Sequence, residues 1–276
     1  MSHQRTATAR HYLMCRPSYF TVEYAINPWM DPAVPTDTAQ AVAEWERLRA
    51  VYRDLGHRVD LIDPVPGLPD MVYAANGATV LDDRVLVAAF RHDERAGEST
   101  AYKEWFQQQP DNYQVSAATY TNEGEGDYLV AGPRILAGTG FRTEPSAHAE
   151  AQDVLKAPVV TLTLIDPRYY HLDTALAVLD DETVMYNPDA FSPGSLRVLR
   201  TLYPEAILAD ADEAAVFGLN AVSDGRNVVL PAAATTLAAK LRARGFNPIG
   251  VALPELLKGG GSIKCCTLEL RHAAHA

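Results

Sequence analysis

NGATVLDDRVLVAAF, residues 76–90, is the clearest copy of a pattern that recurs along this chain of 276 residues. A polar residue, Asn76, precedes an apolar run; two aspartates follow, and then comes a second apolar run. Two short apolar runs rich in valine and joined by a tight turn are typical of a β-hairpin. The segment therefore predicts two antiparallel strands with a polar side chain in front of the first.

Four further segments begin in the same way, with a polar residue before an apolar strand that is usually followed by a tight turn and a second strand: EGEGDYLVAGPRILAGTGF (123–141), HLDTALAVLDDETVMYN (171–187), NAVSDGRNVVLP (220–231) and CCTLEL (265–270). The leading residues of these segments are Glu123, His171, Asn220 and Cys265. Starting from Asn76, each follows the one before it by 47, 48, 49 and 45 residues in turn. Asn27 in YAINPWM lies a further 49 residues before Asn76, in a less strand-like context. A near-constant period indicates one supersecondary unit repeated along the chain.

Helical patterns separate these hairpins. In residues 38–57 the apolar residues Val42, Trp45, Leu48 and Tyr52 recur at helical spacing, with Gly56 as a stop signal. Similar patterns occupy 101–109, 146–156, 194–204 and 235–245, and short apolar runs predict strands in 57–63, 159–166, 205–210 and 247–253. We therefore expect an α/β fold of five strand–turn–strand–helix units. Because no linker or change of composition divides the chain, we expect a single domain over residues 1–276.

The composition excludes several kinds of partner. Lys and Arg number 24 and Asp and Glu 35, which gives a formal net charge of −11. Nucleic acid and anionic membranes would repel such a surface, whereas a cationic small molecule would be attracted. No apolar run is long enough to span a bilayer, and the N-terminus does not resemble a signal peptide. The three cysteines, an odd number with two adjacent, do not form a disulfide framework and favour a reducing cytoplasm.

The leading residues form a chemically reactive set if five units close into a ring. A thiolate attacks electrophilic carbon, a histidine moves protons near neutral pH, and a carboxylate can orient that histidine. Cys265, His171 and Glu123 are therefore candidates for a nucleophilic site. Each alone is also compatible with a buried core residue or, for Glu123 and Glu125, a solvated acidic loop. Metal binding is disfavoured because neither CxxC nor HxxxH is present.

Strand alternation bears on the two adjacent cysteines. Successive side chains of a strand point to opposite faces, so only one cysteine of CCTLEL can face the ring axis. If the leading residue of every repeat faces the axis, that cysteine is Cys265. We then expect Cys266 to be buried in the core, together with Cys15.

Several stretches together resemble the guanidine-modifying enzymes of the pentein superfamily. These are YAINPWM (24–30), PDMVYAANGATVL (69–81), ERAGE (94–98), EGEGD (123–127), GTGFRTE (138–144), LIDPRYYHLDT (164–174) and GGGSIKCCTL (259–268). The superfamily includes arginine deiminases, dimethylarginine dimethylaminohydrolases and amidinotransferases, and the chain looks most similar to the arginine dihydrolase branch. The resemblance implies a five-bladed α/β propeller with pseudo-fivefold symmetry. It also implies that the reaction needs no metal or organic cofactor.

The resemblance also implies roles for particular residues. Cys265 matches the nucleophile, His171 the general acid and base, and Glu123 its carboxylate partner. Asp173, expected on the same strand face as His171, matches the residue that binds the guanidinium. Arg95 and Arg142 match arginines that hold the α-carboxylate of the substrate.

Two departures from the superfamily pattern concern Asn76 and the EGEGD loop. Deiminases and methylarginine hydrolases usually have Asp in place of Asn76, whereas the dihydrolase branch has Asn there and a second Asn matching Asn27. An amide cannot clamp a guanidinium through charge. The EGEGD loop is one residue longer than the usual EGGD, so the choice of Glu123 over Glu125 follows the dihydrolase pattern.

The expected function is a C–N hydrolase for linear amidines that converts arginine into ornithine, ammonia and carbon dioxide. The alternative is a dimethylarginine dimethylaminohydrolase that releases citrulline and dimethylamine, followed by an arginine deiminase or an amidinotransferase. The alternative from a different class of protein is a non-catalytic binding module, because a ribosome anti-association factor has the same propeller fold without catalysis. The expected partner is arginine or a methylarginine, and the sequence is compatible with a homo-oligomer.

Overall fold

Five three-stranded sheets organise the computed structural model, which describes residues 5–273. In every sheet the first two strands pair antiparallel, as a hairpin in four of the five sheets, and the third runs parallel to the second. The sheets consist of β3 (Ala78–Leu81), β4 (Arg84–Val87) and β5 (Gln114–Ala117); β6 (Tyr128–Ala131), β7 (Arg134–Thr139) and β8 (Val159–Thr163); β9 (Leu176–Val178), β10 (Val184–Tyr186) and β11 (Ile207–Leu208); β12 (Val222–Ser223), β13 (Asn227–Pro231) and β14 (Asn247–Val251); and β15 (Leu268–Glu269), β1 (His11–Cys15) and β2 (Arg58–Ile62). The repeat predicted from the sequence is thus present as five sheets of one topology.

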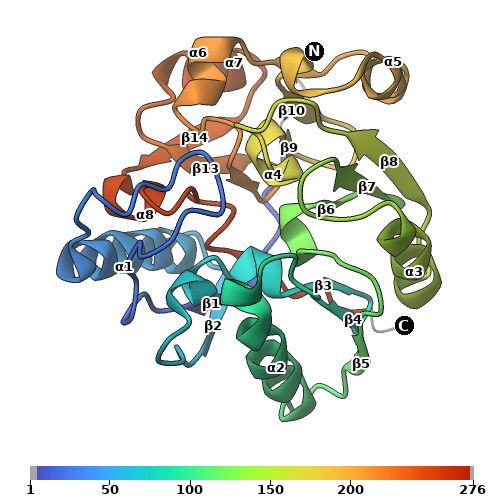
Figure 1. Cartoon of the computed structure of the whole chain (residues 1–276). Coiled ribbons are helices and arrows are strands. Elements are labelled where there is room, and N and C mark those ends of the chain that lie inside the picture. Colours follow the sequence, from blue (N-terminus) through green and yellow to red (C-terminus); the bar gives the residue numbers. More distant parts are fainter. Residues whose placement is uncertain (1–4, 274–276) are drawn as a thin grey trace.

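A helix connects the two parallel strands of every sheet, because parallel neighbours need a crossover. These connecting helices are α1 (Thr38–Asp54), α2 (Asp93–Gln107), α3 (Ser146–Leu155), α5 (Pro193–Leu202) and α7 (Thr235–Ala243). In α1 the predicted apolar face packs inward, with Trp45, Leu48 and Tyr52 fully buried. Figure 1 shows the sheets around the middle of the molecule, with these helices towards the outside.

The two ends of the described chain meet in one sheet. Strand β15 pairs antiparallel with β1, and the register places Tyr12 opposite Glu269 and Leu13 opposite Leu268. The last repeat is therefore completed by the first strand of the chain. None of the helices within residues 5–273 combines the length and the apolar character needed to cross a membrane.

The polar leading residues lie in short turns before their hairpins and not on the strands themselves. The short helices at these turns are η1 (Pro69–Val72), η2 (Ala74–Gly77), η3 (Gly124–Gly126) and α4 (Leu172–Ala175). Other short helices are η4 (Pro188–Ala190), α6 (Ala211–Ala215) and α8 (Pro254–Leu257). The strand positions expected for His171 with Asp173, and for the two adjacent cysteines, are therefore wrong. His171 is the N-cap of α4 and Asp173 lies within that helix, while Cys265 and Cys266 lie in a turn that precedes β15.

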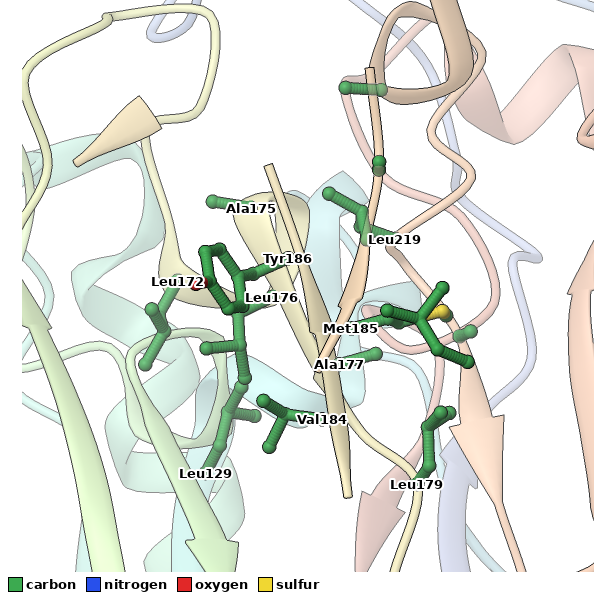
Figure 2. Packing of buried hydrophobic residues seen from close by; sticks show 14 of the residues in the cluster. Leu129, Leu172, Ala175, Leu176, Ala177, Leu179, Val184, Met185, Tyr186 and Leu219 are labelled. Carbon is green, nitrogen blue, oxygen red and sulfur yellow. The ribbon is translucent and has the colours of Figure 1, made fainter. Parts of the chain in front are cut away.

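A hydrophobic cluster joins three neighbouring sheets behind these turns. Figure 2 shows Leu129 from β6 facing Leu176 and Val184 from β9 and β10, with Met185 on the opposite side of β10 towards Leu219. Because one continuous core supports several sheets, the relative positions of their leading turns depend on this packing.

Truncation of Leu176, which is fully buried in this cluster, is expected to destabilise the fold. Leu176→Ala should lower the free energy of unfolding by about 2–5 kcal/mol through lost burial and the remaining cavity. Leu208→Ala, in the neighbouring strand β11, is the matched control because Leu208 is 48% exposed, and it should change the value by less than about 0.5 kcal/mol. Equal effects in urea denaturation would contradict this assignment of the core.

Candidate active site

Five polar side chains from four repeats are buried together at the leading turns: Asn76, Glu123, His171, Asp173 and Cys265, none more than 2% exposed. Contacts between them span sequence separations of 48 and 92 residues. Burying ionisable groups is unfavourable unless they are paired, so such a cluster is typical of a functional site. The sequence-predicted nucleophilic set is therefore brought together in space.

Glu123 is the carboxylate that contacts His171. Its Oε2 lies 2.7 Å from His171 Nε2 and also accepts a hydrogen bond of 2.7 Å from Arg142 Nη1, while Oε1 accepts from the backbone N–H of Arg91 at 3.2 Å. Although burial alone would raise the pKa of Glu123, Arg142 and His171 hold it well below its usual range. Glu123 is therefore a permanent anion that fixes the orientation of the imidazole ring.

Glu125 lies on the other side of the EGEGD turn. It accepts hydrogen bonds from Lys264 Nζ at 2.6 Å and from the backbone N–H of Glu269 at 3.0 Å, and it pairs with Arg271. Arg271 also pairs with Glu269 at 2.7 Å, so the C-terminal residues are tied to this carboxylate. The geometry therefore associates Glu123 with the imidazole and Glu125 with an ionic network beside β15.

Cys265 faces the polar cluster. Its Sγ lies 3.2 Å from Asp173 Oδ2 and 3.1 Å from Asn220 Nδ2. The Oδ1 atom of Asn220 accepts from the backbone N–H groups of Lys264 and Cys265, at 2.9 and 3.2 Å. Asn220 therefore fixes both the backbone and the thiol of the cysteine turn, a role that its place in the repeat could have indicated. Cys266 is fully buried in an apolar cluster, as expected, and Cys265 borders the same cluster.

The electrostatics around Cys265 favour the neutral thiol. Burial first, and the neighbouring carboxyl of Asp173 second, raise the thiol pKa well above its usual value. Burial also raises the pKa of Asp173 to about 6. A cation placed between the two groups would counteract both effects, because an opposite charge favours the ionised form of an acid.

Three buried polar atoms at the site have no hydrogen-bond partner within residues 5–273: His171 Nδ1, Asp173 Oδ1 and Asp70 Oδ1. Asp70, which the sequence pattern did not single out, is 2% exposed, and its Oδ2 accepts from Tyr24 Oη at 2.9 Å. Buried polar groups in proteins are normally paired. These atoms can therefore accept hydrogen bonds from a ligand, and the two carboxylates suit a cationic ligand.

Arg95 is committed to neighbours in the protein. Its guanidinium donates to both carboxylate oxygens of Glu98 at 2.8 Å, to Asn76 Oδ1 at 2.8 Å and to the carbonyl of Asp70 at 3.3 Å. Four of its five N–H groups are thus used, so Arg95 cannot present a free fork to a carboxylate. The same contact occupies the Asn76 oxygen and leaves its Nδ2 pointing at the carbonyl of Glu123, at 3.4 Å.

Asn27 joins the N-terminal segment to the glycine run. Its Oδ1 accepts from the backbone N–H of Trp29 at 2.9 Å, and its Nδ2 donates to the carbonyl of Gly259 at 3.2 Å. A Cβ atom at Gly260, whose φ is +85°, would lie 2.5 Å from Asn27 Oδ1. Glycine is thus required where this segment packs against the cysteine turn. Within residues 5–273 no group of three or more His, Cys, Asp or Glu side chains is suited to hold a metal ion.

A buried thiol, an imidazole paired with a carboxylate, and unpaired acceptors for a cation define a cysteine-dependent hydrolase of the pentein superfamily. A family model described as "N,N dimethylarginine dimethylhydrolase, eukaryotic" matches residues 16–272. The chain belongs to this family and is an enzyme that hydrolyses guanidino groups of arginine-type molecules.

Two curated relatives and one solved structure show the range of similarity. The N(G),N(G)-dimethylarginine dimethylaminohydrolase of Mycobacterium tuberculosis is 57% identical over 97% of this chain and 88% of that protein. The bifunctional arginine dihydrolase/ornithine cyclodeaminase ArgZ of Synechocystis is 36% identical over 94% of this chain, which spans only 37% of ArgZ. The substrate-bound N-terminal domain of ArgZ superposes with a TM-score of 0.91 at 35% identity, covering 95% of this chain and 98% of that domain.

Removal of the Asp173 charge should make Cys265 more reactive while it impairs hydrolysis. Asp173→Asn eliminates the carboxyl that, after burial, raises the thiol pKa, so labelling of Cys265 by iodoacetamide at neutral pH should be faster than in the unmodified enzyme. Mass spectrometry of the labelled peptide measures the rate, with Cys265→Ser as the control for the site of labelling. Unchanged or slower labelling of a folded Asp173→Asn protein would contradict this electrostatic assignment.

Proposed function

We propose that this enzyme hydrolyses Nω,Nω-dimethylarginine to citrulline and dimethylamine. The observation that carries the proposal is the 57% identity, over 97% of the chain, to a dimethylarginine dimethylaminohydrolase, combined with a thiol, imidazole and carboxylates in contact at one site. The sequence alone favoured the arginine dihydrolase, and the nearer relative now favours the alternative.

The pattern of free acceptors supports a methylated substrate. In the proposed pose the guanidinium lies over Cys265 and donates to Asp173 Oδ1, while the α-ammonium of the substrate pairs with Asp70 Oδ1. On the side of Asn76 the amide oxygen already accepts from Arg95, so only one lone pair of that oxygen remains for guanidinium N–H groups. A dimethylated nitrogen carries no N–H and needs no acceptor, whereas the two N–H groups of an arginine amino group would compete for that lone pair, at some cost.

The reaction proceeds by covalent catalysis in this proposal. The Cys265 thiolate adds to the guanidinium carbon, and the bond from that carbon to the dimethylated nitrogen breaks as His171 gives that nitrogen a proton. Water then attacks the resulting thiouronium carbon, His171 accepts a proton from it, and the carbon–sulfur bond breaks to release citrulline. Glu123 stabilises the imidazolium in both steps, Asp173 holds the guanidinium, and the set requires no cofactor.

The substrate-binding residues beyond the reacting centre keep their expected roles with one modification. Arg142 contributes to binding the α-carboxylate, Asn27 positions the segment over the glycine run, and Asn76 lines the leaving-group side. Arg95 acts mainly by fixing Asn76, because Glu98 and Asp70 occupy most of its donors.

An arginine dihydrolase is the second candidate. Asn76 and Asn27 match that branch, and an arginine dihydrolase domain bound to its substrate has the same fold with a TM-score of 0.91. In that reaction a second cycle at the ureido carbon would yield ornithine, ammonia and carbon dioxide. The Asn76 Nδ2 group could then donate to a ureido oxygen, which a carboxylate could not do.

The architecture expected from the sequence forms part of the same proposal. Five sheets of one topology, with the last completed by the first strand, support a closed five-bladed propeller formed by a single catalytic domain over residues 1–276. The three cysteines are free and buried, which supports a reducing compartment such as the cytoplasm.

Amino-acid analysis after separate incubations with dimethylarginine and arginine tests the proposal. Citrulline and dimethylamine from dimethylarginine, with slower or no turnover of arginine, are the expected result. Ornithine from arginine would instead establish the dihydrolase. Citrulline from arginine as the main product would identify a deiminase.

Replacement of Cys265 tests the assignment of the nucleophile. Cys265→Ser should reduce turnover at least about 10³-fold, because the hydroxyl is a far weaker nucleophile, while the circular dichroism spectrum stays unchanged. Cys266→Ala is the matched control, since its side chain packs in an apolar cluster, and it should retain activity. Substantial turnover by a folded Cys265→Ser protein would contradict the mechanism.

A further inference from the structure

Asn220 is the leading residue of a repeat that has no role in the mechanism described so far. Its side chain is fully buried, in the turn that precedes β12. The backbone N–H of Asn220 donates to the carbonyl of Phe217 at 2.9 Å, and Phe217 has a φ of +58°, a left-handed conformation that is uncommon for a residue with a side chain. This tight turn presents Asn220 to the cysteine turn of the last repeat.

The hydrogen bonds of Asn220 fix which end of its amide faces the sulfur. Oδ1 accepts from the backbone N–H groups of Lys264 and Cys265, and a backbone N–H can only donate. The other end of the amide must therefore be the NH2 group. Its Nδ2 lies 3.1 Å from Cys265 Sγ and 3.1 Å from the carbonyl oxygen of Asp173, so each of its two N–H groups has one acceptor.

Asn220 and Asp173 contact the same sulfur with opposite consequences. The thiol proton of Cys265 points to Asp173 Oδ2, 3.2 Å from the sulfur, and only the neutral thiol can make that hydrogen bond. The N–H of Asn220 instead donates to the sulfur, and a hydrogen bond is roughly twice as strong when its acceptor is ionised. Burial and the carboxyl of Asp173 raise the thiol pKa, and the backbone N–H of Ser262 opposes them. Asn220 is placed to act in the same direction as Ser262.

We infer that Asn220 is a catalytic residue whose side-chain N–H stabilises the Cys265 thiolate and holds it beside Asp173. The inference rests on the proposed function, since it requires Cys265 to be the nucleophile. Because the same amide donates to the backbone carbonyl of Asp173, it also sets the distance between the attacking sulfur and the carboxylate that receives the guanidinium. All the hydrogen bonds of this side chain go to protein groups, so its loss should affect the chemical step more than substrate binding.

The variant Asn220→Ala tests the inference through turnover and through the reactivity of the thiol. It should lower kcat about ten- to a hundredfold, the range for a hydrogen bond to a charged group, and should change KM by less than about threefold. Alkylation of Cys265 by iodoacetamide should also become slower, because the thiolate loses a donor. A looser or more open cysteine turn would have the opposite effect, since it would expose the thiol and speed alkylation. Asn247→Ala, at an exposed position of β14 in the same sheet, is the matched control and should leave both rates unchanged.

A second measurement keeps Asn220 intact and so does not depend on whether its variant folds. In nuclear magnetic resonance spectra of the 15N-labelled enzyme, the side-chain N–H proton of Asn220 that faces the sulfur should lie further downfield than in Cys265→Ala, where the acceptor is missing. Equal shifts in the two proteins would show that this hydrogen bond is absent and would overturn the inference.

Two outcomes for a folded Asn220→Ala protein would also overturn the inference. Unchanged kcat would remove Asn220 from the mechanism, and a lower kcat with unchanged or faster alkylation would make it a support of the turn alone. Failure of the proposed function has a different signature, namely turnover retained by Cys265→Ser or other products from the guanidino compounds.

Discussion

The carboxylate of Glu123, fully buried between an imidazole and a guanidinium, is the interaction on which the rest of the site depends. An isolated buried anion would be strongly unfavourable, and two cationic or hydrogen-bonding partners on one oxygen make this one stable. Because Glu123 and His171 come from different repeats, the pair exists only where two sheets are held in a fixed relation. The hydrophobic cluster between those sheets fixes their relative positions, so the geometry of the site depends on the packing of the core.

Close approach of backbones is the second requirement, and glycines in the EGEGD turn satisfy it. At Gly124, whose φ is +54°, a Cβ atom would lie 2.7 Å from the carbonyl oxygens of Ala75 and Ala78. At Gly126 a Cβ atom would lie 2.3 Å from Asn76 Nδ2 and 3.1 Å from His171 Nδ1. Only a residue without a side chain lets the leading turns of adjacent repeats approach so closely. The glycines therefore determine how near the amide and the imidazole lie to the carboxylate.

The sequence predicted the repeat, the hairpins and the crossover helices, because hydrophobic periodicity and turn residues act locally. It also predicted which polar residues would meet, since a constant period places equivalent positions of all repeats at the same end of their units. The fine geometry was not predictable in this way. The segment after His171 is a short helix, so the expectation that Asp173 lies on the same strand face as His171 was wrong, and the contact between Asp173 and Cys265 depends on tertiary structure. The partners of Arg95 depend on tertiary contacts, although Glu98, three residues further along α2, was a visible local candidate.

The unpaired acceptors connect specificity to nucleophilicity at this site. Asp173 lies beside the thiol, where its charge suppresses the thiolate, and its second oxygen is available to a guanidinium. A cationic substrate that pairs with Asp173 removes that suppression at the moment when its own carbon lies next to the sulfur. A neutral molecule of similar shape would fill the site without favouring the thiolate. Asn76 has a different character, because its oxygen already accepts from Arg95 and its Nδ2 adds N–H donors on that side. In the proposed reaction the N–H groups of the guanidinium face the free oxygen of Asp173 and its methylated nitrogen faces Asn76, so the different hydrogen-bonding character of the two sides would orient the substrate before any bond is formed.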